Sequence, residues 1–241
     1  MKRIFLFTVI AATLCLYAVL SACASARISV PGALPSPAAL PLPEIDGNSL
    51  FGVDKNINID TIDNFLGRND VAYIDVRMLF DSADFGAIGG ESELNRTIHG
   101  FRIIPYPYIA TLPQLPVSGA YEGPSLFTLT WDETGSIASA TPNFIESEII
   151  LDELFPRDKA IFLMCGGGGY SGMMKSLLAY LGWNENLLYN IGANWTYTGN
   201  NALELAAYPD GASGDKIYAT WRADYAYIDF SRLHPVAGDD E

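Results

Sequence analysis

The sequence contains little basic charge, histidine or cysteine. Its 241 residues include 14 Lys and Arg against 28 Asp and Glu, with two His and three Cys, and the formal net charge is −14. This balance argues against nucleic-acid binding, because a phosphate-binding surface needs clustered Lys and Arg and the chain has no basic run. It also argues against a zinc site, which usually draws four nitrogen or sulfur ligands. We therefore expect no nucleic-acid partner and no metal.

The first 22 residues have the composition of a signal peptide. Lys2 and Arg3 precede an uncharged apolar run, residues 4–20. The run ends in Leu-Ser-Ala-Cys, which resembles a bacterial lipobox, so Cys23 is predicted to carry a lipid that anchors the protein to the bacterial cell membrane, facing outside the cytoplasm. A membrane-spanning helix is the less favoured alternative, because prolines from Pro31 onward prevent the helix from continuing.

Composition divides the rest of the chain into four parts. Residues 23–48 are rich in Ala, Pro and Ser and predict a tether. A folded domain is expected over residues 49–200, and at 49% hydrophobic residues overall the chain can bury a core without disulfides or metals. A C-terminal extension packed on this domain is expected over residues 201–235, and an acidic tail over residues 236–241.

Short apolar runs alternate with helical patterns in the folded part. The predicted strands cover residues 71–77, 101–104 and 160–164. The predicted helices cover residues 59–66, 143–154 and 171–181. This alternation predicts an α/β domain with a mostly parallel central sheet flanked by helices, whose ligand site lies beyond the carboxyl ends of the strands. An inserted hairpin is predicted within residues 126–138, with its turn at 132–135.

Cys165 is the thiol that remains for chemistry. Cys15 would leave with the signal peptide and Cys23 would be lipidated, so no internal disulfide is expected. The segment after the predicted strand 160–164 reads Cys165-Gly166-Gly167-Gly168-Gly169-Tyr170-Ser171. Its glycines let the loop turn backbone N–H groups inward as an anion-binding nest, and the following helix adds its positive dipole end.

A cysteine in this setting is predicted to have a depressed pKa and to exist partly as the nucleophilic thiolate. The common structural role of cysteine is that of a small buried hydrophobe. For Cys165, the combination of strand, glycine loop and helix favours the functional interpretation.

Four segments, in order, resemble a rhodanese-like domain over residues 58–200. Residues 73–77, Tyr-Ile-Asp-Val-Arg, are similar to that family's first-strand motif. Residues 98–105 are similar to its Ile-Pro-Gly segment, with His99 and Phe101 as departures. Residues 165–171 resemble its Cys-x-x-Gly-x-Arg-Ser loop, and residues 181–195 resemble its closing pattern of Leu-Gly-Tyr and Gly-Gly-x-x-x-Trp.

The resemblance implies a sulfurtransferase that needs no cofactor. Cys165 would take a sulfane sulfur from a small donor or a protein persulfide, hold it as a persulfide and pass it to a thiol or cyanide. The N–H groups of residues 166–171 would stabilise the persulfide. Asp75 and Arg77 are expected behind the loop, where they would pair and orient it.

Tyr170 stands where the family often carries Arg in this loop. Loss of such a charge-assisted contact removes about 1.5–3 kcal/mol, which disfavours thiosulfate and favours a persulfide on a small thiol or another protein. The missing charge also supports an alternative, a catalytically weak rhodanese-like module that binds a protein partner or a sulfur species. A phosphatase is disfavoured, because its Cys-x5-Arg spacing places Ser171 where the Arg should stand.

Other conspicuous side chains have structural interpretations. Trp183 and Trp195 are expected in the core or at a rim, and Tyr170 at the mouth of the pocket. His99 and His234 are expected to be satisfied core or surface residues. Extra core is also the favoured interpretation, ahead of a partner surface, for the aromatic region 216–233, which contains Tyr218, Trp221, Tyr225, Tyr227 and Phe230.

Overall fold

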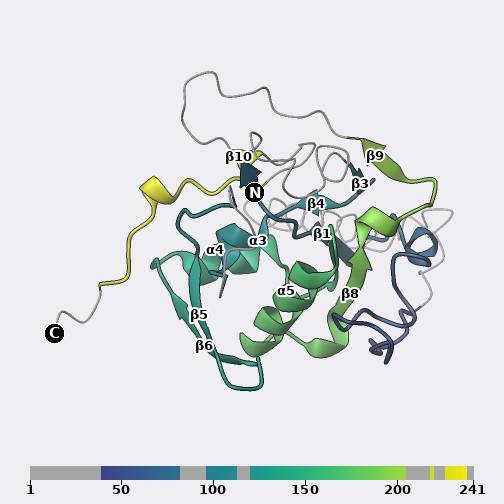
Figure 1. Cartoon of the computed structure of the whole chain (residues 1–241), viewed down its shortest axis with the longest axis horizontal. Helices are drawn as coiled ribbons and strands as arrows, with labels where there is room; N and C mark the ends of the chain where they lie inside the picture. The colour runs from purple at the N-terminus through teal and green to yellow at the C-terminus, as the bar shows by residue number, and fades with distance from the viewer. Residues whose placement is uncertain (1–38, 82–95, 113–119, 205–217, 220–225, 238–241) are drawn as a thin grey trace, which may run out of the picture. The chain divides into compact units, whose positions relative to one another are not determined.

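The computed structural model describes residues 39–81, 96–112, 120–204, 218–219 and 226–237, which are drawn in colour in Figure 1. The described helices and strands all belong to one unit, Leu40–Glu241. The predicted signal peptide, Cys23, Trp221 and Tyr225 lie outside the described residues. Among the described helices, none has the length and apolar character needed to cross a membrane.

The centre of the fold is a four-stranded sheet in the order β4-β1-β7-β8. Its strands are β1 (Val71–Asp75), β4 (Arg102–Ile103), β7 (Ala160–Cys165) and β8 (Leu188–Ala193), and every neighbouring pair is parallel. β7 is buried along its whole length, as its continuous apolar sequence predicts for a central strand of an α/β sheet. The predicted α/β class with a parallel central sheet is confirmed.

The described α-helices pack on one face of this sheet, where their buried residues share one cluster (Figure 1). α5 (Gly169–Tyr180) follows β7 directly and packs against β7 and β8. α4 (Ser147–Leu154) is shorter than the predicted helix 143–154, because the carbonyl of Asn143 accepts from the N–H of Val236 and not from that of Ser147, which bonds to Phe144. α3 is a single turn, Tyr106–Ile109, that begins immediately after Pro105.

The predicted helix over residues 59–66 is wrong. The structure has only a 3-10 turn there, η1 (Ile62–Asn64). Polar side chains compete for the backbone, since Thr61 Oγ1 accepts from the N–H of Asn58 and Asn58 Oδ1 accepts from the N–H of Asp60. Such local side-chain bonds favour turns over a continuing helix.

The inserted hairpin is present, as predicted. β5 (Phe127–Trp131) and β6 (Ile137–Pro142) pair antiparallel. Their turn is stabilised by Asp132, whose Oδ1 accepts from the N–H groups of Thr134 and Ser136. Gly135 adopts a φ of +80°, a conformation that glycine reaches without steric cost.

Short elements complete the described part of the fold. Two further antiparallel pairs join β2 (Phe80–Asp81) to β10 (Tyr218–Ala219) and β3 (Arg96–Ile98) to β9 (Ala202–Glu204). The remaining 3-10 turns are η3 (Glu185–Leu187), η4 (Asn194–Thr196) and η5 (Phe230–Arg232).

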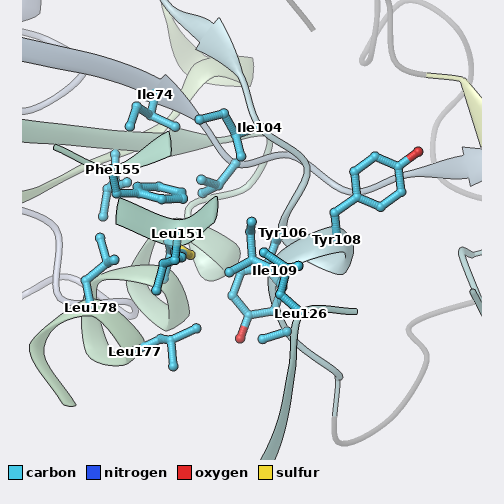
Figure 2. Close-up of a cluster of buried hydrophobic side chains, with 14 of the residues drawn as sticks. Ile74, Ile104, Tyr106, Tyr108, Ile109, Leu126, Leu151, Phe155, Leu177 and Leu178 are labelled. Carbon is cyan, nitrogen blue, oxygen red and sulfur yellow. The ribbon is translucent and has the colours of Figure 1, made fainter. Parts of the chain in front are cut away.

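The sheet separates two hydrophobic clusters. Alternate residues of β7 point to opposite faces, so Ile161, Leu163 and Cys165 join one cluster while Phe162 and Met164 join the other. Figure 2 shows the first cluster, in which residues of β1 and α3 meet residues of α4 and α5. On the other face, Phe162 makes edge contacts with the rings of Tyr73 and Tyr189. Cys165 therefore belongs to the cluster that α5 covers.

The folded unit begins earlier than the predicted boundary at residue 49. Tyr189 donates a hydrogen bond to the carbonyl of Pro41, and the buried carboxylate of Asp54 accepts from the N–H of Glu44. Residues 40–48 are thus packed on the domain and are not tether. Their proline-rich composition predicts a tether because it does not reveal partners that lie far along the chain.

The described part of the C-terminal extension packs on the domain, as predicted. Ala226 and Ile228 are buried in the first cluster, and the N–H of Ala226 donates to the carbonyl of Ile103. Phe230 packs against Tyr108 and Phe144. Tyr227 is largely exposed, although its ring also contacts Tyr108. Of the two described aromatic side chains of this region, the core interpretation therefore holds for Phe230 and not for Tyr227.

Candidate functional site: a buried cysteine beneath an aromatic pocket

Cys165 is the last residue of β7 and lies at the carboxyl edge of the central sheet. In the strand register, Asp75 of β1 pairs with Met164, and Ala193 of β8 pairs with Cys165. The carboxyl ends of three parallel strands, β1, β7 and β8, therefore lie side by side around the thiol of Cys165. This is the edge at which the α/β pattern predicts a ligand site.

The glycine loop folds back onto the sulfur. Gly168 adopts a φ of +92° at the N-cap of α5, and its N–H donates to Cys165 Sγ at 3.0 Å. The hydroxyl of the buried Ser171 donates to the carbonyl of Gly168 at 2.8 Å and makes a longer contact of 3.8 Å to Sγ. Within the described structure, Gly168 and Ser171 of the predicted nest thus reach the thiol.

The predicted depression of the Cys165 pKa is wrong. Cys165 is 1% exposed, and burial raises the pKa of its thiol, with a further raising contribution from the negative charge of Asp75. The N–H and hydroxyl of Ser171 and the N–H of Gly168 lower the pKa, but burial has the larger effect. Removing a thiolate from water disfavours the charged form, so the resting side chain is a neutral thiol.

A pocket with a volume of about 210 Å³ opens above Cys165. Most of its wall is apolar or aromatic, and Arg77 is the charged side chain among the described residues that line it. The lining consists of Phe51, Arg77, Met78, Cys165, Gly166, Gly167, Gly169, Tyr170, Met173 and Trp195. Tyr170 lies in the wall of this pocket, in keeping with its expected position.

Two aromatic rings lie against the glycine loop, and Gly166 makes room for one of them. A Cβ on Gly166 would come within 2.5 Å of the Trp195 indole, a distance that real side chains do not tolerate. On the other side, the ring of Phe51 lies 3.4 Å from the Cβ position of Gly168 and 3.7 Å from that of Gly169, which are ordinary van der Waals distances. Gly166 therefore has a packing role, whereas Gly168 is favoured by its positive φ.

Asp75 and Arg77 form a buried ion pair, as expected. Arg77 Nη2 lies 2.5 Å from Asp75 Oδ2, and the Arg77 side chain is only 4% exposed. The same carboxylate oxygen accepts from Thr97 Oγ1 at 2.8 Å, while Arg77 also donates to the carbonyl of Arg96 at 2.6 Å. Arg77 was expected behind the loop, yet it also forms part of the pocket wall. Arg77, which follows β1, therefore brings to the pocket a positive charge that the loop of residues 166–171 does not contain.

Phe51 and Asn190 contribute to the site without having been predicted. The fully buried Asn190 of β8 donates from Nδ2 to the carbonyl of Phe51 at 2.7 Å and accepts from the N–H of Gly192 at 3.0 Å. Gly172 keeps this approach open, because a Cβ there would lie 2.7 Å from the Phe51 carbonyl oxygen. A buried Asn within an apolar strand was the available sequence signal.

Tyr170 joins the pocket to the core. Its ring stacks on Tyr106 with centroids 5.5 Å apart and an interplanar angle of 23°. Burial raises the pKa of Tyr170 to about 12, so its phenol stays neutral and offers no charge to an anion. Tyr170 thus replaces the Arg of the resembled loop with an aromatic wall.

The other predicted side chains occupy structural positions. Trp183 is buried, donates from Nε1 to the carbonyl of Phe155 and carries Arg157 over its ring, whereas Trp195 is 37% exposed at the pocket rim. His99 lies at the surface, as does His234, whose ring is bonded to Glu146.

Fold and site together define an α/β protein with a buried cysteine at the floor of an aromatic pocket. No protein-family model matches the chain, and neither a curated protein nor a solved structure matches it significantly. The resemblance to rhodanese-like domains therefore rests on the four sequence segments, and any function assigned to the chain rests on the site.

Proposed function

We propose that the protein is a membrane-anchored, rhodanese-like sulfurtransferase that carries a sulfane sulfur as a persulfide on Cys165. The observation that carries this proposal is the Gly168 N–H, which donates to Cys165 Sγ at 3.0 Å at the floor of the pocket. The same donor, together with the N-terminal end of α5, is placed to stabilise negative charge on a sulfur one bond further out.

The neutral state of the thiol suits a donor that brings its own negative charge. With an organic persulfide anion, the proton of Cys165 passes to the donor, the resulting thiolate attacks the outer sulfur, the donor S–S bond breaks and a new S–S bond forms on Cys165. The Cys165 proton leaves on the departing thiol, so Cys–SH and R–S–S⁻ give Cys–S–S⁻ and R–SH. A thiol acceptor reverses these bond changes, and neither direction needs an external oxidant or reductant.

The pocket wall favours an organic donor over thiosulfate. Phe51, Met173 and Trp195 offer apolar surface to an organic group, whereas Arg77, the cation among the described lining residues, already pairs with Asp75 and is less available to a dianion. The formal net charge of −14 also repels small anions at low salt. We therefore place a small-thiol or protein persulfide ahead of thiosulfate as the donor.

Intact-mass measurement tests this function directly. The full chain and its Cys165→Ser variant are each exposed briefly to an alkyl persulfide or to thiosulfate. We expect a gain of one sulfur atom with the persulfide, mapped to the Cys165 peptide and absent from the variant. Equal sulfur uptake by both proteins, or no uptake with either donor, would refute sulfur transfer through Cys165.

The burial of Cys165 favours a second candidate function. A thiol that is 1% exposed and has a raised pKa reacts slowly, as expected of a catalytically weak rhodanese-like module that binds a sulfur species or a protein partner. In that case a nonreactive thioether ligand would bind the pocket with similar affinity in the native chain and in Cys165→Ser, while neither protein would gain sulfur.

A further inference from the structure

A second pocket lies between the hairpin and α5. Its volume is about 320 Å³, at the lower end of the range of about 300–1,000 Å³ that is typical of small-molecule sites. Trp131 and Ser136 of the hairpin region face Met173, Ser176 and Tyr180 of α5 across it. The Tyr180 hydroxyl donates to the carbonyl of Ala138 and so ties the helix to the hairpin.

Tyr106 also lines this pocket and has a hydroxyl that lacks a partner. The side chain is fully buried, and its Oη makes no hydrogen bond to any described residue. In Figure 2 the hydroxyl end of the ring is turned away from Ile74 and Ile104. A buried donor without a partner is costly, and a ligand in this pocket would relieve that cost if its binding shifted the Tyr106 ring enough for an acceptor atom to reach the hydroxyl.

The chemistry of the lining describes the ligand. Among the described residues, those that line the pocket carry no charge, and the turn beside it carries the acidic side chains of Asp132 and Glu133, which repel anions. Trp131 and Tyr180 offer faces to a flat ring. Ser176 uses its proton on the carbonyl of Gly172, so its oxygen is left to accept from a ligand.

We propose that this hairpin pocket is a second small-molecule site for a neutral compound with one ring and an oxygen acceptor, and that its occupancy changes the Cys165 pocket. Two contacts connect the pockets. Met173 lines both of them, and Tyr106 stacks on Tyr170, which lines the Cys165 pocket. A ligand that engages Tyr106 therefore acts on the wall beside the thiol.

Benzamide is a suitable probe, because it combines a neutral ring with a carbonyl acceptor and an amide donor. We expect saturable binding to the full chain by saturation-transfer NMR, with much weaker binding of benzoate, which is charged, and of acetamide, which has no ring. Tyr106→Phe should weaken benzamide about tenfold without lowering the melting temperature, because it removes only the unpartnered hydroxyl. Ser176→Leu should abolish binding by filling the pocket from an exposed helix position.

The connection between the pockets is tested without any sulfur transfer. Alkylation of Cys165 by iodoacetamide is followed on its peptide by mass spectrometry, with and without saturating benzamide. We expect the rate to change at least twofold in the native chain and not in Ser176→Leu. Absence of saturable binding, or equal binding by the native chain and both variants, would overturn the site, and binding without a rate change would overturn the connection.

Discussion

The indole of Trp195 lies directly on the backbone of Gly166, where any Cβ would stand 2.5 Å from the ring. The backbone N–H of Trp195 also donates a hydrogen bond to the carbonyl of Gly166. The loop that holds the thiol and the 3-10 turn after β8 therefore form one unit, in which a glycine is required by a neighbouring side chain.

Substitution in this loop separates packing from backbone freedom. Gly166→Ala should lower the free energy of unfolding by about 1–3 kcal/mol, because Trp195 must move to admit the methyl group. Gly167→Ala is the matched control, since its Cβ would meet Trp195 at an ordinary 3.7 Å and its φ is not positive. The control should stay within about 0.5 kcal/mol of the native value in urea unfolding. Equal losses would show that the indole does not constrain the loop.

The raised pKa of Cys165 makes stability depend on pH at the alkaline end. The folded state disfavours the thiolate, so the contribution of this thiol is fully present below the pKa of an unfolded cysteine, about 8.5, and is lost as the pH rises through the folded pKa. We expect Cys165→Ala to remove this part of the alkaline decline in urea-unfolding free energy. The difference between the unfolding free energies of the native chain and of Cys165→Ala, plotted against pH, cancels the contributions of other titrating groups. If this difference does not change above a pH of about 8.5, the pKa of Cys165 is not raised.

The buried ion pair should be far more sensitive than an exposed one. Asp75→Asn removes the carboxylate that pairs with the buried guanidinium of Arg77 and should cost about 3–5 kcal/mol of unfolding free energy. The double variant Asp75→Asn/Arg77→Met should recover part of that loss. The exposed pair of Lys55 and Glu44 is the control, and Lys55→Gln should cause no measurable change. The single variant Arg77→Met completes the comparison. If the losses of unfolding free energy in Asp75→Asn and Arg77→Met add up to the loss in the double variant, the two charges are not coupled.

Asn190 is predicted to hold Phe51 at the pocket. Asn190→Ala removes the bond to the Phe51 carbonyl, and hydrogen exchange across residues 46–54 should become about 5- to 150-fold faster, because a lost buried hydrogen bond costs about 1–3 kcal/mol. Alkylation of Cys165 should accelerate as its cover loosens. Asn186→Ala, at an exposed position, is the control and should leave the exchange rate unchanged. Unchanged exchange in Asn190→Ala would show that Asn190 does not hold Phe51 in the wall of the pocket.

Local pattern was sufficient to predict the central elements of the fold. The apolar run at residues 160–164 and the glycine loop after it identified β7 and the start of α5 nearly to the residue. These features depend on neighbouring residues, which a sequence displays directly. The parallel sheet followed from the alternation of such runs with helices.

Features that depend on distant partners were missed. Residues 40–48 resemble a tether in composition, but they are packed because Tyr189 donates a hydrogen bond to the carbonyl of Pro41 and Asp54 accepts one from the N–H of Glu44. The pKa of Cys165 was predicted in the wrong direction for the same reason. Its N–H donors are local and visible in the sequence, whereas the burial that outweighs them comes from the surrounding sheet, helix and aromatic rings.

The bond from Asn190 to Phe51 spans 139 residues of sequence. Contacts of such long range form late in folding, because the chain between them must first be organised. β8, which carries Asn190, is the last strand of the central sheet to appear in the chain. A folding or newly synthesised chain therefore passes through a stage in which Cys165 is already present but uncovered, and the order of folding sets how long the thiol is open to unintended reactions.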